Sequence, residues 1–323
     1  MATAYTPGAE EPDALLGSVL SAVAYADLFD YPLTLDELVR YQAGSIACRD
    51  QIADLLATHP DLPTPLVEGS GYYSLRDSKR DLARTRRHRA RRSAMLWKRA
   101  VSYSRLISRL PYVRMVAVTG ALAVNNVGSL PDIDLLVVAS TGRVWLCRRA
   151  LIMLVRLARL RGDDLCPNYI ISEDTLDLDQ RDFFTAHELA QMVPLYGLEI
   201  HARMIEHNAW ARDYLPSAFD DAPELDLALP DALRGRSPVE RLLDRPVFDR
   251  LEAWELRRMR ARLQPLLGDD AEVVCTPAQC KGHTGLNRRR VMRRFQDRLR
   301  DLNLLDRAPQ VVLHDFAMLP DDG

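Results

Sequence analysis

The stretch that decides the fold is Val113–Ser140, VRMVAVTGALAVNNVGSLPDIDLLVVAS. It contains an apolar run, a turn at Gly120 and a second apolar run that opens with Asp132 and Asp134. Successive side chains of a β-strand point to opposite faces, so a strand here places both carboxylates on one face and Ile133 on the other. The unbroken apolar run that follows is typical of a strand covered on both sides by helices. The sequence therefore predicts an α/β sheet carrying two acids on one face.

Two carboxylates this close need a neutralising partner. Like charges raise each other's pKa unless a cation compensates them, and a hard divalent cation with oxygen ligands is the usual solution. Upstream, Gly120 ends an apolar strand at Val118 and precedes a helix-compatible stretch, Ala121–Val124. A glycine at such a turn lets backbone N–H groups approach an anion closely. Phosphate at Gly120 and a divalent cation at Asp132 and Asp134 together describe a nucleotide site.

This combination resembles the nucleotidyltransferase fold of the polymerase-β-like superfamily. The Gly-centred turn follows a strand, and a D-x-D strand follows about twelve residues later. The resemblance implies a small mixed sheet flanked by helices, with the turn at Gly120 holding the nucleotide's phosphates and Asp132 and Asp134 binding Mg²⁺. It also implies transfer of a nucleotidyl group from an NTP, with ATP as the expected donor, to an acceptor hydroxyl or phosphate. No residue identifies the acceptor.

Two positions depart from the family pattern. The family turn is usually Gly-Ser, whereas Ala121 follows the glycine here, so one hydroxyl donor is missing while the backbone donors remain. The third family carboxylate is expected on the strand Leu165–Ile171, where this chain has Asn168. An asparagine can ligate a metal through its carbonyl oxygen but cannot take a proton. The nearby acids that could replace the third carboxylate are Asp163, Asp164, Glu173 and Asp174.

The departures leave a rival hypothesis open. A non-catalytic nucleotide-binding or nucleic-acid-binding regulatory protein could keep this fold without turnover. Ala121 and Asn168 favour that rival, whereas the presence of both Asp132 and Asp134 favours the enzyme.

Composition sets outer limits on the protein's class. The chain has 323 residues, 47% of them hydrophobic, and a net charge of −2, which suits two or three ordinary domains. Such a balance argues against wholesale coating of nucleic acid, although local basic patches remain compatible with it. Five scattered cysteines predict no disulfide framework and a reducing, cytoplasmic setting.

We expect neither a secretory signal nor a membrane span. Residues 1–13 have no basic segment followed by an apolar one. The longest apolar stretch, Val144–Leu160, is interrupted by four arginines, which is typical of an amphipathic helix packed on a sheet.

Residues 1–77 are predicted to form an N-terminal winged-helix-like module. The pattern indicates helices at Leu15–Phe29, from Thr34 to Tyr41 and at Arg49–Thr58, followed by two short strands within 66–75. DNA binding is one interpretation of such a module. The candidate recognition helix, Arg49–Thr58, sets one arginine against Asp50 and Asp54, which favours packing or partner binding instead.

A basic connecting helix is predicted over 78–110. Residues 78–109 contain twelve Lys or Arg and one acid, Asp81. One stripe of the helix would contain Arg80, Arg84, Arg87 and Arg91. Together with Trp97 and Tyr103, this pattern over 79–109 is typical of an RNA or polyanion footprint. The alternative is a linker helix docked against acidic residues elsewhere in the chain.

The remaining chain divides into three parts. The nucleotidyltransferase-like domain is expected at 111–214 and includes a helical segment, Arg181–Trp210, that could line the acceptor side. That segment contains Glu188 and His187, and a lone histidine in such a helix is more typical of structure than of catalysis. An acidic, Pro-rich linker at 215–237 and a helical C-terminal region at 238–323 follow.

The C-terminal region holds a further candidate site. Lys281 and His283 accompany glycines just before a helix whose Val291, Phe295 and Leu299 share one face. The basic first turn of that helix is expected to point outward, which would make an anion site, with Lys281 and His283 as nucleotide ligands, in place of a plain surface loop. A zinc site of Cys275, Cys280 and His283 is an alternative, whose fourth ligand would have to be His314 or a water.

Overall fold

The structure is a computed structural model that describes residues 12–61, 65–78, 81–220, 238–243, 245–264, 273–281 and 287–319. The predictions made for His283 and its neighbours Gly282 and Gly285, for Lys79 and Arg80, and for 221–237 of the linker concern residues outside these ranges. No helix within the described ranges combines the length and the apolar character needed to cross a membrane.

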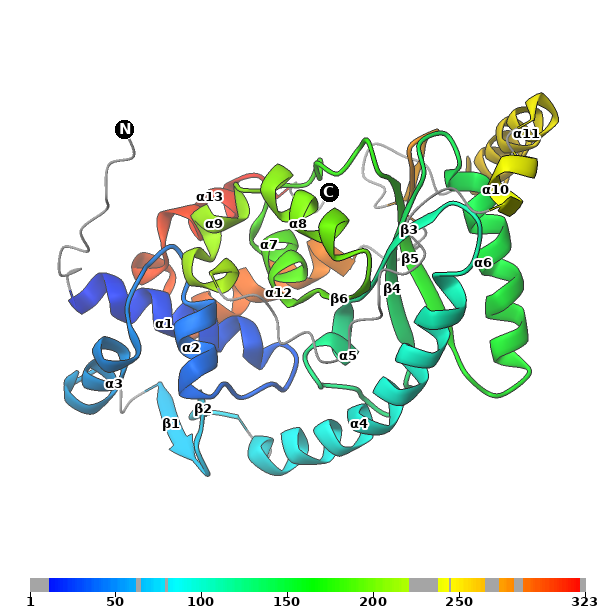
Figure 1. The fold of residues 1–323 in the computed structure, drawn as a ribbon. Coiled ribbons are helices and arrows are strands. Elements are labelled where there is room, and N and C mark those ends of the chain that lie inside the picture. The colour runs from blue at the N-terminus through cyan, green and yellow to red at the C-terminus, as the bar shows by residue number, and fades with distance from the viewer. Residues whose placement is uncertain are drawn as a thin grey trace.

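A mixed sheet forms the centre of the molecule, as predicted (Figure 1). Its strands, in spatial order, are β6 (Val193–Tyr196), β3 (Val113–Val118), β4 (Ile133–Ala139), β5 (Leu165–Ser172), β8 (Gln279–Lys281) and β7 (Val274–Cys275). The strands β4 and β5 run parallel and are joined through α6 (Val144–Arg159), whereas the other pairings are antiparallel. The predicted α/β class is therefore confirmed.

Helices cover both faces of this sheet. Two of them, α4 (Leu82–Ile107) and α6, pack on one face with Leu135 and Val137 of β4, joined by α11 (Pro246–Leu263). Leu136 and Val138 point to the other face, which is covered by helices that include α7 (Phe183–Gln191) and α12 (Asn287–Asp301). The unbroken apolar run of β4 is thus explained by burial on both sides.

The predicted N-terminal elements are confirmed. They are α1 (Pro12–Asp27), α2 (Leu35–Tyr41), α3 (Arg49–Thr58), β1 (Leu66–Gly69) and β2 (Tyr72–Leu75). The capping box between Thr34 and Glu37 that starts α2 is present. Leu33 forms an additional antiparallel bridge with Tyr73, which ties the hairpin to the segment before α2.

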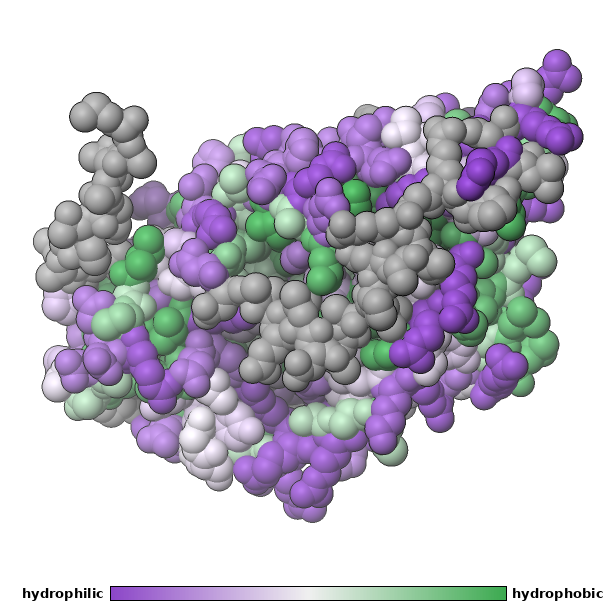
Figure 2. All heavy atoms as spheres, viewed as in Figure 1, coloured by the Kyte–Doolittle hydropathy of each residue, from purple (hydrophilic) through white to green (hydrophobic). Residues whose placement is uncertain are grey.

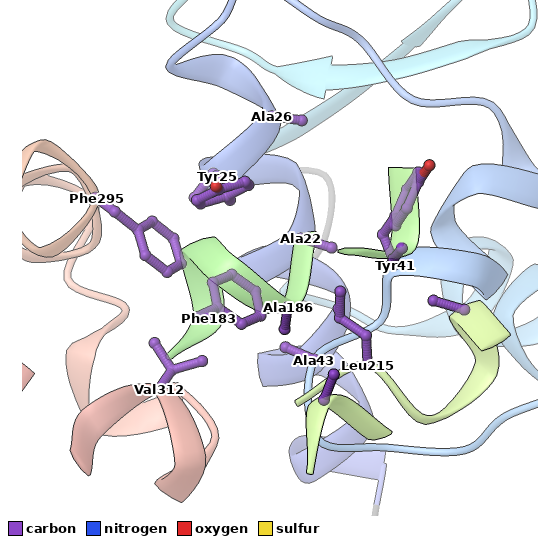
Figure 3. Close-up of a cluster of buried hydrophobic side chains, with 14 of the residues drawn as sticks. Ala22, Tyr25, Ala26, Tyr41, Ala43, Phe183, Ala186, Leu215, Phe295 and Val312 are labelled. Carbon is purple, nitrogen blue, oxygen red and sulfur yellow. The ribbon is translucent and has the colours of Figure 1, made fainter. Parts of the chain in front are cut away.

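The first helix lies at the centre of a core shared with the C-terminal helices. Every residue of α1 from Leu15 to Ala26 is buried, as expected for a helix that is apolar all round. Figure 3 shows Tyr25 beside Phe183 of α7 and Phe295 of α12. The rings of Tyr25 and Phe295 meet edge to face with centroids 5.3 Å apart, and those of Phe183 and Phe295 stack at 5.4 Å. The N-terminal helices therefore share one core with the far end of the chain.

The remaining described elements complete this helical layer and its surroundings. They are α5 (Gly120–Ala123), α8 (Leu198–His207), α9 (Ala211–Tyr214), a 3₁₀ turn at Pro216–Phe219, α10 (Pro238–Leu243), a 3₁₀ turn at Leu305–Arg307 and α13 (Gln310–Ala317).

Two segments expected to be helical contain strands. The strand β6 interrupts the segment Arg181–Trp210, and it is an edge strand, where the missing N–H of Pro194 is tolerated. The C-terminal region, otherwise helical, contributes β7 and β8, which extend the sheet beyond β5. All three strands are short, and β6 and β8 pair with strands far away in sequence, so local periodicity carries little sign of them.

Candidate functional site

The turn at Gly120 and the acidic strand are in direct contact. Gly120 has a φ of +64°, and a Cβ built on it would lie 2.5 Å from Oδ2 of Asp134. The backbone N–H of Thr119 donates to the carbonyl oxygen of Asp134 at 3.0 Å, which fixes the two strands at this point. Only a residue without a side chain can let the carboxylate approach this closely. The predicted phosphate-binding turn therefore lies directly beside one of the predicted metal ligands.

Asp132 and Asp134 flank the inward-pointing Ile133, as the alternation predicts. Ile133 is buried, whereas both acids are half-buried. Burial raises the pKa of Asp134 to about 7, and the neighbouring charge of Asp132 adds to this effect. A cation bound between the two carboxylates would reduce the repulsion between them.

Asn168 reaches the same carboxylate through a β-bulge. Leu135 pairs with Pro167 and Leu136 with Tyr169, so Asn168 is the extra residue of β5 at this position. Its side-chain amide donates to Oδ1 of Asp134, and its carbonyl oxygen lies 2.7 Å from Sγ of Cys166. The hydrogen bond from Asn168 favours the ionised form of Asp134 and partly offsets the burial. The amide thus presents a donor, not a third carboxylate, to the pair.

The four alternative acids have other surroundings. Asp163 accepts from the hydroxyl of Tyr103 at 2.6 Å, and Asp164 pairs with Arg159 at 3.2 Å. Glu173 lies 3.9 Å from Arg114, and Asp174 accepts from the hydroxyl of Thr175 at 3.3 Å. Only Asp164 acts noticeably on Asp134, where its charge raises the pKa. Within the described residues, none of the four forms a hydrogen bond with the pair as Asn168 does.

The two carboxylates suit one of the two ways in which proteins bind a divalent cation. Within the described residues, no group of three or more His, Cys, Asp or Glu side chains is placed to hold a metal ion. Mg²⁺ does not need such a cage, because it is commonly bound by one or two carboxylates and completes its octahedron with water and substrate phosphates. Asp132 and Asp134 fit that second arrangement.

A pocket of about 210 Å³ opens beside Gly120. We call it the aromatic pocket; its walls include Tyr25, Phe29, Tyr31, Tyr41, Gly120, Ala121 and Glu188. The walls are contributed by α1, the loop that follows it, α2, α5 and α7. The pocket is therefore assembled from the N-terminal helices and from the turn of the predicted phosphate site.

Glu188 is the carboxylate that lines this pocket, and the sequence did not single it out as a site residue. Within the described part of the chain, no side-chain hydrogen bond contributes to its electrostatics. Burial raises its pKa, and the charge of Lys281 opposes that shift. Its charge in turn raises the pKa of Asp134, so the two carboxyls belong to one electrostatic neighbourhood.

His187 is a structural residue, as its helical setting predicted. Its Nδ1 lies 2.9 Å from the carbonyl oxygen of Phe183, and its ring is 4.2 Å from that of Tyr25. Burial lowers its pKa to about 4, so the ring is neutral at physiological pH. His187 also borders the aromatic pocket, as an uncharged wall.

The C-terminal candidate lies apart from Gly120. Lys281 is on β8, donates to Oε1 of Gln180 at 2.9 Å, and has its Nζ 5.8 Å from the ring centroid of Tyr169. It lines a separate, smaller pocket with these residues. Arg288 of α12 forms an ion pair with the buried Asp182, so the expectation that this basic turn points wholly outward was wrong. The structure does not bring Lys281 into one pocket with Gly120, and His283 lies outside the described residues.

The zinc alternative gains no support from the neighbours of the two cysteines. Cys275 and Cys280 face each other across the β7–β8 pairing, and both are buried and free. Among the described residues, neither belongs to a cluster of three metal-ligating side chains.

The aromatic pocket could be anticipated only in part. Tyr25, Tyr31 and Tyr41 lie in or near predicted helices, but no local pattern indicates that these helices dock onto the Gly120 turn. Glu188 stood in a segment expected to line the cleft, without a spacing that marked it. Comparison with known proteins adds no assignment: no protein-family model matches the chain, and no curated protein or solved structure is significantly similar to it.

Proposed function

We propose that this protein is a Mg²⁺-dependent nucleotidyltransferase that moves a nucleotidyl group from an NTP, with ATP as the favoured donor, to an acceptor hydroxyl or phosphate. The observation that carries the proposal is the contact between Gly120 and the carboxylate of Asp134. A turn able to hold phosphate and a carboxylate able to hold a cation are the two parts that phosphoryl chemistry requires side by side.

Each residue has a specific role in this proposal. The backbone N–H groups after Gly120 hold the triphosphate, and Asp132 and Asp134 hold the cation. Mg²⁺ bound there would neutralise the charge of the leaving pyrophosphate and lower the pKa of the acceptor oxygen. Asn168 orients the Asp134 carboxylate through its hydrogen bond. The aromatic pocket offers its rings to the nucleobase, since stacking on aromatic side chains suits any base.

Transfer of label from α-labelled ATP to acceptors in a cell extract tests the proposal. The wild-type chain should label an acceptor in the presence of Mg²⁺, and Asp134→Asn should abolish the labelling. Asp164→Asn is the matched control, because the charge of Asp164 also acts on Asp134 but its side chain pairs with Arg159. It should retain at least half of the activity. Equal labelling by wild type and Asp134→Asn would contradict the proposed role of Asp134.

One observation favours the rival function, a nucleotide-binding regulatory protein without turnover. Asn168 supplies an amide donor where a third carboxylate would serve as a base. The two functions separate in one pair of measurements. An enzyme shows Mg²⁺-dependent ATP binding and labelling together, whereas the rival shows binding that Asp134→Asn weakens, with no labelled acceptor in any extract.

We further propose that the N-terminal helices and hairpin form a winged-helix-like module with a packing role. The bridge between Leu33 and Tyr73 gives the hairpin the third short strand that such modules carry. Arg49 of α3 pairs with Asp36, so this helix offers a poor surface to DNA phosphates. A gel-shift assay with duplex DNA checks this, and binding that Arg49→Gln abolishes would overturn it.

A further inference from the structure

A second and larger cavity adjoins the aromatic pocket. It has a volume of about 640 Å³ and is more open. We call it the arginine cleft; its lining includes Arg40, Arg86, Arg87, Arg91, Tyr72 and Trp97. Tyr31 and Tyr41 border both cavities, so the two lie side by side. The cleft runs between α4, α2 and the end of α5, the helix that begins at Gly120.

Many of the arginines of α4 are used to fasten this helix to the protein. Arg86 donates both terminal nitrogens to the carboxylate of Glu37, at 2.6 and 2.7 Å. Arg89 pairs with Asp30 at 2.9 Å. Arg92 donates to the carbonyl oxygen of Gly128, and Arg99 pairs with Asp163. The docked-helix interpretation therefore accounts for these four residues.

It does not account for Arg87 and Arg91. Both side chains are exposed, both line the arginine cleft, and within the described residues neither forms an ion pair or a hydrogen bond through its guanidinium. They lie four residues apart and so project from one side of the helix. Figure 2 shows a hydrophilic surface along the edge of the molecule where Figure 1 places α4.

Arg40 adds a third cation from the opposite wall. One terminal nitrogen of Arg40 donates to the carbonyl oxygen of Ala190 at 2.9 Å, and its buried Nε has no hydrogen-bond partner within the described residues. In this cleft the charge of Glu37 is already engaged by Arg86. The cleft therefore presents an excess of positive charge from two walls, with Trp97 and Tyr72 at its sides.

We propose that the arginine cleft binds the end of a single-stranded nucleic acid, with Arg87 and Arg91 contacting its phosphates. Arginines that follow a backbone, interleaved with aromatic rings that stack on bases, are the combination used for single strands. A volume of about 640 Å³ admits one or two nucleotides but not a duplex. The strand is thereby the acceptor class for the proposed transferase, an identification that rests on the proposed function. The contact with Arg87 and Arg91 does not depend on it.

The test is binding of a fluorescent single-stranded RNA of roughly ten nucleotides, followed by anisotropy over a range of salt concentrations. The double variant R87Q/R91Q should bind about tenfold more weakly or worse. Loss of two phosphate contacts should also reduce the slope of log K against log salt by about 1.4. The matched control is R105Q/R109Q, which neutralises two exposed arginines at the other end of the same helix region, away from the cleft. It should leave both quantities unchanged.

Competition experiments show which kind of phosphate-containing ligand the cleft prefers. Single-stranded DNA of the same sequence reports whether the sugar matters, and either sugar supports the proposal. Duplex RNA that competes as well as the single strand, or AMP that competes equally at the same concentration of phosphate, would overturn it. So would the absence of RNA binding by the wild-type chain, or an equal loss of binding in both double variants.

The same samples keep this proposal separate from the proposed function. Mg²⁺-dependent ATP binding is measured alongside RNA binding. RNA binding that depends on Arg87 and Arg91 without any ATP binding would remove the transferase and leave the nucleic-acid site. ATP binding and labelling without RNA binding would remove the nucleic-acid site and leave the transferase.

Discussion

Gly120 and Asp134 lie so close together that one additional carbon atom on Gly120 would clash with the carboxylate of Asp134. A Cβ on residue 120 would lie only 2.5 Å from Oδ2 of Asp134, closer than two such atoms can approach. The glycine is needed twice, because its φ of +64° also lies in the left-handed region. The geometry of the turn and the position of the acid are consequently inseparable.

Gly120→Ala should therefore damage both stability and the site. The left-handed backbone alone costs about 1–2 kcal/mol for an alanine, and the displaced carboxylate adds to this, so we expect a loss of about 2–4 kcal/mol. Urea unfolding measures the loss, and titration with ATP and Mg²⁺ measures the site. Binding should fall by more than the loss of folded protein explains.

Gly142→Ala is the control for this substitution. Gly142 has a similar φ of +67°, but nothing lies within 4 Å of its Cβ position. It should cost about 1–2 kcal/mol and leave binding intact. If the two variants were equally stable and bound ATP equally well, the contact with Asp134 would have no energetic meaning.

Asn168→Asp should convert the site towards three carboxylates. The new charge beside Asp134 destabilises the metal-free protein, by about 1–3 kcal/mol at neutral pH, because two half-buried like charges repel each other. Mg²⁺ should recover more stability in this variant than in the wild type, which thermal unfolding with and without the ion measures. The control, Asn168→Ala, removes the hydrogen bond to Asp134 without adding charge. A smaller Mg²⁺-induced shift in Asn168→Asp than in wild type would argue against a cation at this position.

The sequence predicted those features that local patterns encode. The capping box at Thr34, the alternation around Ile133 and the turn at Gly120 each depend on residues a few positions apart, and each is present. The reason is that backbone geometry within one turn or strand is set by neighbours in the chain.

The features that it did not predict depend on distant pairings. The strand β8 is held by β5, more than a hundred residues earlier, and β6 carries a proline that only an edge position tolerates. The aromatic pocket needs α1 and α7 to meet beside α5. Such docking is decided by the fit of apolar surfaces across the whole fold, which periodicity within one helix does not report. For the same reason, the sequence does not indicate which arginines of α4 form ion pairs or hydrogen bonds with distant residues.

Ala121→Ser should restore the hydroxyl donor that the family turn would supply. Ala121 is exposed and borders the aromatic pocket, so a serine fits there without repacking the core. One hydrogen bond to a charged phosphate should strengthen ATP binding by about 1 kcal/mol, roughly fivefold. Isothermal titration with a non-hydrolysable ATP analogue and Mg²⁺ measures the change. Ala123→Ser, at the end of the same short helix, is the control and should have no effect. A gain in both variants, or in neither, would contradict the proposed phosphate position.

His187→Phe should remove part of the acid sensitivity of the fold. Burial holds the pKa of His187 at about 4, below its ordinary value of 6.5, so the unfolded chain binds this proton first as the pH falls. The neutral ring therefore contributes its full stability above pH 6.5 and loses up to about 3 kcal/mol by pH 4. The phenylalanine keeps the ring contacts with Tyr25 and Tyr41 but carries no titrating group. Urea unfolding at intervals from pH 7 to pH 4 should show a shallower decline in the variant, and His201→Phe should act in the same direction because burial lowers the pKa of His201 in the same way. Parallel curves for wild type and His187→Phe would show that this histidine is protonated without cost in the folded protein.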